Sequence, residues 1–174
     1  MQGNNVSDLR RGLAATAILA ALAAPAPLAA GDWVFTIGPD LGRGSTKAAE
    51  STFVTVEYRS PTALATIWGV PLQPIWSISG NDRGAVLATW GVHTAFSLGP
   101  VEVTPHFGVG LYQSGQGGAG RGKELLQFRS GIDAFVPISD RTAVGLGIAH
   151  VSNARITSRS ANLDIVRLSL RQRF

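Results

Sequence analysis

The sequence predicts an all-β protein, an eight-stranded antiparallel up-and-down transmembrane β-barrel. After residue 31, apolar side chains recur at every second position in segments of about nine to thirteen residues, which is the period of a β-strand, and no helical period is sustained. The alternate positions of these segments are polar or charged, as expected of a barrel with a lipid-facing wall and a polar interior. The connections are alternately long and short, which is typical of external loops and periplasmic turns.

Residues 1–30 are predicted to be a secretory signal peptide and are left out of the fold. Arg10 and Arg11 form its basic region, an Ala- and Leu-rich run follows over residues 12–24, and Pro25 interrupts that run. Small residues before Gly31 provide a cleavage site. The apolar run is too short to span a bilayer comfortably, and an N-terminal membrane anchor is the alternative interpretation. Residues 31–174 then form the outer-membrane β-barrel.

The composition excludes several classes of site. Residues 31–174 contain 13 basic and 10 acidic side chains, because Asp8, Arg10 and Arg11 belong to the predicted signal peptide, and the net charge is +3. No dense Lys/Arg cluster is present, so nucleic acid is not a predicted partner. There is no cysteine, so disulfides and thiolate metal sites are excluded. After residue 31, no apolar run reaches the roughly eighteen residues of a transmembrane helix.

The first four strands are expected at residues 33–38, 51–59, 63–79 and 85–98. A polar loop at 39–50 follows the first strand, a tight Ser-Pro-Thr turn at 60–62 follows the second, and a loop at 79–84 follows the third. Pro71 and Pro74 make the third strand irregular because proline cannot donate to the hydrogen-bond ladder. The second strand shows the alternation clearly, with Thr55, Glu57 and Arg59 on its polar face.

The last four strands are expected at residues 101–112, 124–136, 142–152 and 163–174. Gly99-Pro100 turns the chain into the first of them, and a Gly-rich loop at 114–123 follows it. Residues 137–141 form a second short turn, and a polar external loop at 153–163 precedes the last strand. Two long loops therefore lie at one end of this half and two short turns lie at the other.

Most charged side chains of the strands lie on the polar faces: Glu57, Arg59, Glu102, Arg129, Asp133, Arg167, Arg171 and Arg173. In an eight-stranded barrel such side chains fill the interior, so the pattern predicts a plugged core and not a pore. His93 and His106 are expected as interior hydrogen-bonding residues, with metal ligation as the alternative. The tryptophans are expected near the membrane interfaces. A soluble periplasmic barrel of the lipocalin type is the alternative fold.

Three polar side chains interrupt the apolar face of the last two strands. His150 and Ser152 continue the register of Leu146 and Ile148, and Asp164 opens the next strand at the same height. A base, a hydroxyl and a carboxylate facing lipid are costly and point to function. Ser152 is a weak nucleophile unless His150 takes its proton, and Asp164 would hold the imidazole in the correct tautomer. The alternative is an inactive polar patch at the membrane interface.

The residues His-Val-Ser-Asn-Ala at 150–154, in the penultimate strand of a small exported barrel, resemble the PagL family of lipid A 3-O-deacylases. The similarity extends over residues 128–154. It implies an eight-stranded outer-membrane barrel that removes the 3-O-linked acyl chain of lipid A without a cofactor. It also implies that Ser152, His150 and Asp164 are catalytic.

The sequence departs from the family pattern beside this site. The family usually has Glu where Asp164 stands, an Asn-Pro-Gly motif where residues 160–162 stand, and a Gly where Arg155 stands. The two latter features are associated with holding the oxyanion, so Asn153 and Asn162 are the candidates here for that role. Arg155 and Arg159 are expected to contact the phosphates of lipid A.

The leading hypothesis is therefore a serine esterase of the outer membrane that acts on lipid A in lipopolysaccharide. A second hypothesis is a non-catalytic structural or adhesive barrel with a degenerate site, and a third is a soluble periplasmic lipid carrier. The sequence leaves open the oligomeric state, including a homodimer, and the acyl-chain preference.

Overall fold

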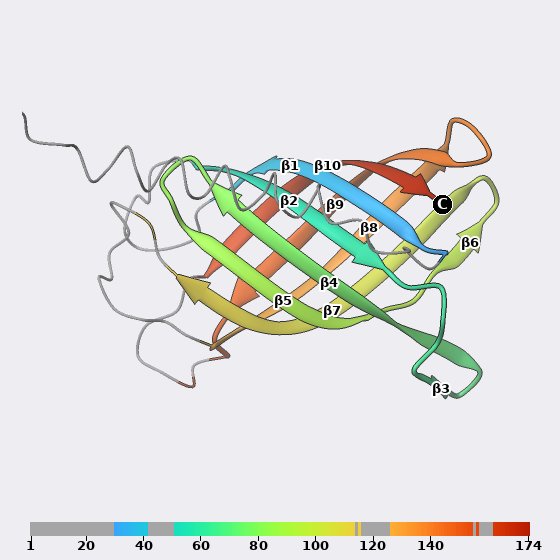
Figure 1. The fold of residues 1–174 in the computed structure, drawn as a ribbon, viewed down its shortest axis with the longest axis horizontal. Coiled ribbons are helices and arrows are strands. Elements are labelled where there is room, and N and C mark those ends of the chain that lie inside the picture. The colour runs from blue at the N-terminus through green and yellow to red at the C-terminus, as the bar shows by residue number, and fades with distance from the viewer. Residues whose placement is uncertain (1–29, 42–50, 114, 116–125, 155, 157–161) are drawn as a thin grey trace, which may run out of the picture.

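The computed structural model describes residues 30–41, 51–113, 115, 126–154, 156 and 162–174, which form a barrel of antiparallel strands (Figure 1). The described residues contain no helix that is long and apolar enough to cross a membrane. The strands are β1 (Asp32–Pro39), β2 (Thr52–Arg59), β3 (Ala65–Ile67), β4 (Val70–Asn81), β5 (Val86–His93), β6 (Phe96–Leu98), β7 (Val101–Gln113), β8 (Leu126–Pro137), β9 (Thr142–Ser152) and β10 (Leu163–Arg173).

Eight of the ten described strands build a closed wall. Each pairs antiparallel with the next along the chain, from β1 through β2, β4, β5, β7, β8 and β9 to β10, and β10 pairs back with β1. The two short strands, β3 and β6, pair with β4 and β7. Closure leaves the wall without an unpaired edge, as a bilayer requires. The predicted eight-stranded antiparallel up-and-down barrel is confirmed.

Two predicted strands are divided in the structure. Residues 85–98 appear as β5 and β6, which keep one register against β7 on either side of Thr94. The Thr94 amide donates to the carbonyl oxygen of Pro105 (3.2 Å), but Pro105 has no N–H to donate in return, so the ladder is interrupted there.

The prediction of a wall strand that begins at residue 63 is wrong. The chain instead forms β3, reverses at Trp68 and Gly69, and pairs with the beginning of β4. Both turn residues have positive φ (50° and 79°), as in the two-residue turns that connect hairpin strands. The segment is therefore a small hairpin that projects beyond the barrel wall (Figure 1).

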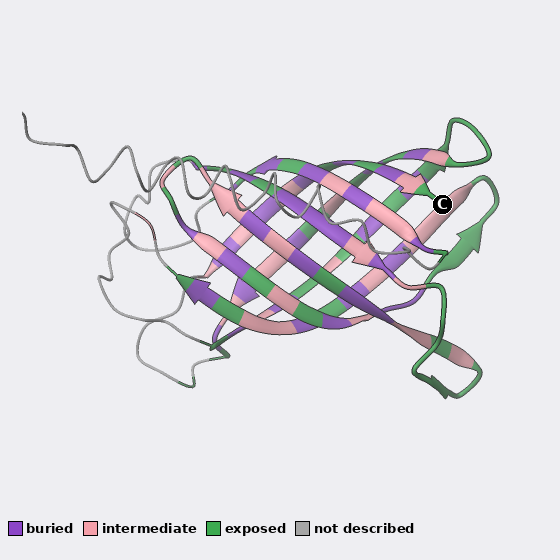
Figure 2. Ribbon diagram, in the orientation of Figure 1, coloured by how far each residue is buried: buried purple, intermediate pink, exposed green. Residues whose placement is uncertain are grey.

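Burial alternates along each wall strand, which produces the banded pattern of Figure 2. In β9, for example, Ala143, Gly145, Ala149 and Val151 are buried, whereas Val144, Leu146 and Ile148 are exposed. The exposed positions are apolar, whereas the buried positions include both apolar and polar side chains. This is the inverse of a water-soluble protein. The outer face is therefore a lipid-facing wall.

A buried ionic network fills the middle of the barrel. Glu57 accepts hydrogen bonds from Arg59 (2.8 Å), Arg167 (2.8 Å) and Arg129. Asp133 accepts from Arg59 (2.5 Å), and His106 Nε2 accepts from Arg167 (2.9 Å). Each of these side chains is at most 6% exposed. The burial of so much charge is tolerable because the arginines are paired with Glu57 and Asp133. The network fills the interior, so the predicted plugged core is confirmed.

Apolar layers close the interior above and below this network. One layer consists of Phe53, Ala85, Leu87, Tyr112, Val151, Leu163 and Ile165. The other contains Val34, Phe135 and Ala143, and the guanidinium groups of Arg171 and Arg59 lie 4.6 Å and 5.4 Å from the centre of the Phe135 ring. Both guanidinium groups lie within the range of a cation–π contact.

The two ends of the barrel are distinguishable. β1 begins and β10 ends at one end, where Asp32 pairs with Arg173, and the turns at 94–100 and 138–141 lie there as well. The connections at the other end include the longer stretches 40–51, 114–125 and 153–162. Since periplasmic turns of outer-membrane barrels are shorter than external loops, we assign the end with Asp32 and Arg173 to the periplasm.

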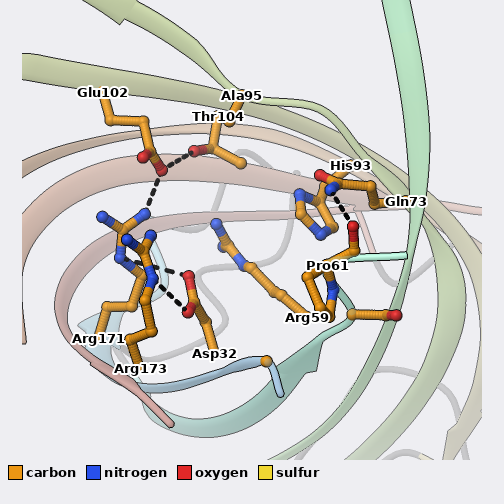
Figure 3. A pocket seen from close by; sticks show the side chains of 12 residues that line it. Asp32, Arg59, Pro61, Gln73, His93, Ala95, Glu102, Thr104, Arg171 and Arg173 are labelled. Atoms are coloured by element: carbon orange, nitrogen blue, oxygen red, sulfur yellow. Dashed lines mark hydrogen bonds and ion pairs between the residues drawn. The ribbon is translucent and has the colours of Figure 1, made fainter. Parts of the chain in front are cut away.

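A cavity of about 220 Å³ opens at this periplasmic end (Figure 3). Arg171 pairs there with Glu102, and Arg173 Nε donates to Asp32 Oδ1 over 3.2 Å. Arg171 Nε also lies 3.6 Å from Asp32 Oδ2. The cavity is a polar mouth in which the cations are paired, and it lies at the opposite end of the barrel from His150 and Asp164.

Candidate active site

The predicted site lies on the hairpin of β9 and β10, at the external end of the barrel. His150 and Ser152 extend the outward face of β9 beyond Leu146 (64% exposed) and Ile148 (59% exposed). In the register of the two strands, His150 lies directly opposite Asp164. The predicted shared face and height of these residues are thus present in the structure.

The inward side chains between these residues anchor the hairpin. Val151 lies between His150 and Ser152 and is completely buried, and Leu163 and Ile165 flank Asp164. All three belong to the apolar layer that closes the external end of the interior. Because successive side chains of a strand point to opposite faces, packing of these three residues fixes the backbone that carries the outward polar groups.

His150 and Asp164 form the central contact of the site. His150 Nδ1 lies 2.8 Å from Asp164 Oδ1, and the two side chains are 43% and 25% exposed. An ionised carboxylate can only accept, so Nδ1–H donates and Nε2 is left with the free lone pair. That tautomer is the one in which an imidazole can take a proton from a nucleophile.

Ser152 lies two residues beyond His150 on the same face of β9 and is partly exposed. Residues i and i+2 of a strand are about 6.6–7 Å apart along the chain, a span that an imidazole ring bridges in large part. Within the described part of the chain, the hydroxyl of Ser152 makes no side-chain hydrogen bond. Nucleophile–base contacts are often long in the absence of substrate.

Asp40, which the sequence analysis missed, supports the carboxylate of the site. It follows β1, forms an isolated bridge to Ile165, and is 5% exposed. Its Oδ1 accepts a hydrogen bond from the Asp164 amide (3.2 Å), and the amide of Leu41 donates to the Asp164 carbonyl (2.7 Å). The only signal in the sequence was that Asp40 continues the inward-facing positions at the end of the first strand.

Side chains of β8 extend the site on its other side and were also missed. Phe128 lies opposite Ser152, and Ser130 lies opposite His150. The Phe128 ring stacks on Phe107 of β7, with 6.1 Å between the ring centres. These aromatic side chains form an apolar surface on the barrel wall beside Ser152. Parity alone indicated that they face lipid, but strand register was needed to place them next to the site.

The other predicted site residues have less defined places. Asn153 is 2% exposed, and its carbonyl oxygen accepts a hydrogen bond from the Ile156 amide (3.0 Å). Asn162 has a positive φ of 45° and stands immediately before β10. Their oxyanion role stays a prediction. Arg155 and Arg159 lie outside the described residues.

These features define an outer-membrane β-barrel with a Ser, His and Asp cluster on its lipid-facing wall. The chain belongs to the lipid A 3-O-deacylase (PagL) family, whose model matches residues 51–173. The family is one of hydrolases that act on lipid A, and the resemblance drawn from residues 128–154 is confirmed. No curated protein sequence matches the chain.

Solved structures support the fold. The outer membrane enzyme PagL is similar with a TM-score of 0.53 at 13% identity, covering 82% of this chain and 98% of that one. A de novo designed transmembrane β-barrel has a TM-score of 0.56 at 11% identity, covering 83% and 95%. Neisserial surface protein A has a TM-score of 0.50 at 13% identity, covering 83% and 97%. These likenesses show the barrel fold, and membership of the PagL family places the protein in the outer membrane.

Proposed function

We propose that this protein hydrolyses the 3-O-linked acyl ester of lipid A with Ser152 as the nucleophile. The observation that carries the proposal is the contact between His150 Nδ1 and Asp164 Oδ1, on the same outward face as Ser152. That contact leaves Nε2 as the base, and Ser152 stands two residues away on the same face of β9, on a surface that lipid reaches.

The chemistry proceeds in two steps. His150 takes the proton of Ser152 as its oxygen attacks the ester carbonyl, and the resulting imidazolium is stabilised by Asp164. The tetrahedral intermediate collapses by breaking its bond to the sugar oxygen, which takes the proton from His150 and leaves as a hydroxyl, and an acyl-serine remains. Water, deprotonated by His150, then attacks the acyl-serine, and the fatty acid is released as Ser152 regains its proton.

The position of the site suits this substrate. His150 and Asp164 lie at the external end of the barrel, where the outer leaflet contains lipopolysaccharide, and the aromatic surface of Phe128 and Phe107 lies beside Ser152. An acyl chain that lies along this wall would present its ester to the nucleophile. No cofactor is required, because base, nucleophile and orienting carboxylate are all supplied by side chains.

The oxyanion and the phosphates of lipid A need further donors. Asn153 and Asn162 are the amide side chains nearest in sequence to the nucleophile and the carboxylate, and we assign the oxyanion to one of them or to the adjacent backbone amides. Arg155 and Arg159 stand on the same connection in the sequence, and we assign the phosphates to them because arginine binds phosphate in a bidentate manner.

The test is mass spectrometry of lipid A from cells that express the protein. The wild type is expected to remove one hydroxyacyl chain, and Ser152→Ala is expected to remove none while keeping heat-modifiable mobility. Ser130→Ala is the matched control, since Ser130 lies opposite His150 on the same outer face. Loss of activity in Ser130→Ala alone would move the nucleophile to β8. Intact lipid A with the folded wild type would favour a non-catalytic structural barrel.

A further inference from the structure

The hairpin between β2 and β4, residues 60–74, is here called the periplasmic hairpin. It contains β3, the turn at Trp68 and Gly69, and the first residues of β4. Every residue from 61 to 69 is exposed, including Leu64 (59%), Ile67 (47%) and Trp68 (99%) (Figure 2). Large apolar side chains that are exposed to this extent indicate a contact surface.

The sequence of this region is unsuited to water. No charged residue occurs between Arg59 and Asp82, so the periplasmic hairpin carries none. The outer edge of β3 is not covered by a further described strand. Edge strands that face water usually carry charges that prevent association with other chains, and this one does not.

The apolar face of the periplasmic hairpin continues the lipid-facing wall. Ala65 pairs with Leu72 and Ile67 pairs with Val70, so these four side chains share one face. Val70 and Leu72 have the same parity along β4 as Trp76, which is 44% exposed on the outer wall. Since side chains at i and i+2 share a face, the lipid-facing surface of β4 extends into the hairpin.

Aromatic side chains mark the membrane boundary where the hairpin begins. Tyr58 lies 5.4 Å from Trp33 and 5.8 Å from Trp76, between ring centres, and Trp90 pairs with Trp76 in register. Rings of this kind form girdles at the interfaces of outer-membrane barrels. The periplasmic hairpin leaves the wall after Arg59, one residue beyond Tyr58, and therefore begins at the margin of the lipid-covered wall, beside the periplasmic leaflet.

The turn of the hairpin is built around an unfavourable residue. Trp68 has a φ of 50°, in the left-handed region that bulky side chains avoid and that Asn or Gly usually occupies in such turns. A strained conformation of this kind points to a functional role for the residue. Tryptophan is the residue that prefers the interface between lipid and water.

We propose that the periplasmic hairpin lies in the periplasmic leaflet of the outer membrane. The face with Ala65, Ile67, Val70 and Leu72 contacts the acyl chains, and Trp68 lies among the headgroups. The occupant of this surface is phospholipid, because the surface is uncharged and is continuous with the wall that lipid already covers. The hairpin thus widens the lipid contact of the barrel at the end opposite the active site.

The experiment measures membrane depth with single spin labels, which the absence of cysteine in the chain makes direct. Full-length Ile67→Cys and Thr66→Cys are labelled in vesicles of phosphatidylethanolamine and phosphatidylglycerol. Leu168→Cys on the wall and Asp82→Cys in the β4–β5 connection serve as lipid and water references. Collision rates with oxygen and with a water-soluble nickel complex are compared. Ile67 is expected to exclude the nickel complex several-fold more strongly than Thr66 and to resemble Leu168.

Three results would overturn the proposal. Both hairpin labels could resemble Asp82, which would mean that the hairpin stands in the periplasm. Spin–spin broadening at position 67 that disappears on dilution with unlabelled protein would mean that a second copy covers the face. Quenching by brominated phospholipid that is identical in the wild type and in Trp68→Phe would place Trp68 away from lipid, and this measurement needs no cysteine variant.

Discussion

The imidazole of His150 and the carboxylate of Asp164 meet across the β9–β10 pair, with 2.8 Å between Nδ1 and Oδ1, on the outer wall of a barrel, next to the exposed apolar side chain of Ile148. The two residues are fourteen apart in the chain and directly opposite in register. A single cross-strand contact adds little to a wall that the strand ladder and the interior network stabilise. It orients the imidazole and is therefore the first target for substitution.

Replacing Asp164 by Asn is expected to lower kcat by about 10³–10⁴-fold, because an amide can donate to Nδ1 and so favour the wrong tautomer. Asp164→Glu is the matched control, since it keeps the carboxylate and places it where the family usually has one. Release of fatty acid from purified lipid A in detergent micelles measures both. An Asn variant as active as the Glu variant would show that the carboxylate does not orient His150.

Asp40 is predicted to be a positioning residue, acting through the backbone of Asp164. Asp40→Ala removes the acceptor of the Asp164 amide and is expected to lower kcat by about ten- to a hundredfold with little change in KM, since small misplacements of catalytic groups are costly. Asp40→Asn, whose side-chain oxygen can accept the same hydrogen bond, is expected to restore kcat. Equal losses in both variants would mean that the charge of Asp40 matters and not its hydrogen bond.

Phe128 is predicted to bind the acyl chain. Phe128→Ala is expected to lower kcat/KM by about tenfold, because burying a large apolar side chain contributes about 1.5–3 kcal/mol and part of that contact is lost. Phe128→Leu, which keeps most of the apolar area, serves as control. The effect should decrease for substrates with shorter 3-O-acyl chains. A loss that does not depend on chain length would argue against an acyl-chain contact.

The interior network is predicted to determine stability. Glu57→Ala leaves three arginines without their shared acceptor and is expected to lower the free energy of unfolding by about 3–5 kcal/mol, the cost of an uncompensated buried charge. Glu102→Gln, at the partly exposed periplasmic mouth, should cost about 1 kcal/mol or less. Urea unfolding in phospholipid vesicles, followed by tryptophan emission, measures both changes.

The sequence alone determined the barrel, the strand number and the two faces of the wall. Lipid on one side and a packed interior on the other impose a period of two, so parity placed Glu57, Asp133 and Arg167 inside and Leu146 and Ile148 outside. The same alternation identified His150, Ser152 and Asp164 as polar residues at lipid-facing positions. They stand out because a lipid-facing polar group is costly wherever it occurs.

Only the tertiary structure decided which residues from distant strands meet. Asp40 reaches Asp164 from β1, and Phe128 lies opposite Ser152 from β8, because register is set by closure of the whole wall and not by any local pattern. The periplasmic hairpin was predicted as part of a wall strand because its apolar residues alternate in the same way as those of β4. Its turn was missed because Trp68 has a positive φ, which is unusual for tryptophan. The alternation of apolar and polar residues is a local property of the chain, whereas contacts between distant strands are determined by how the whole barrel closes.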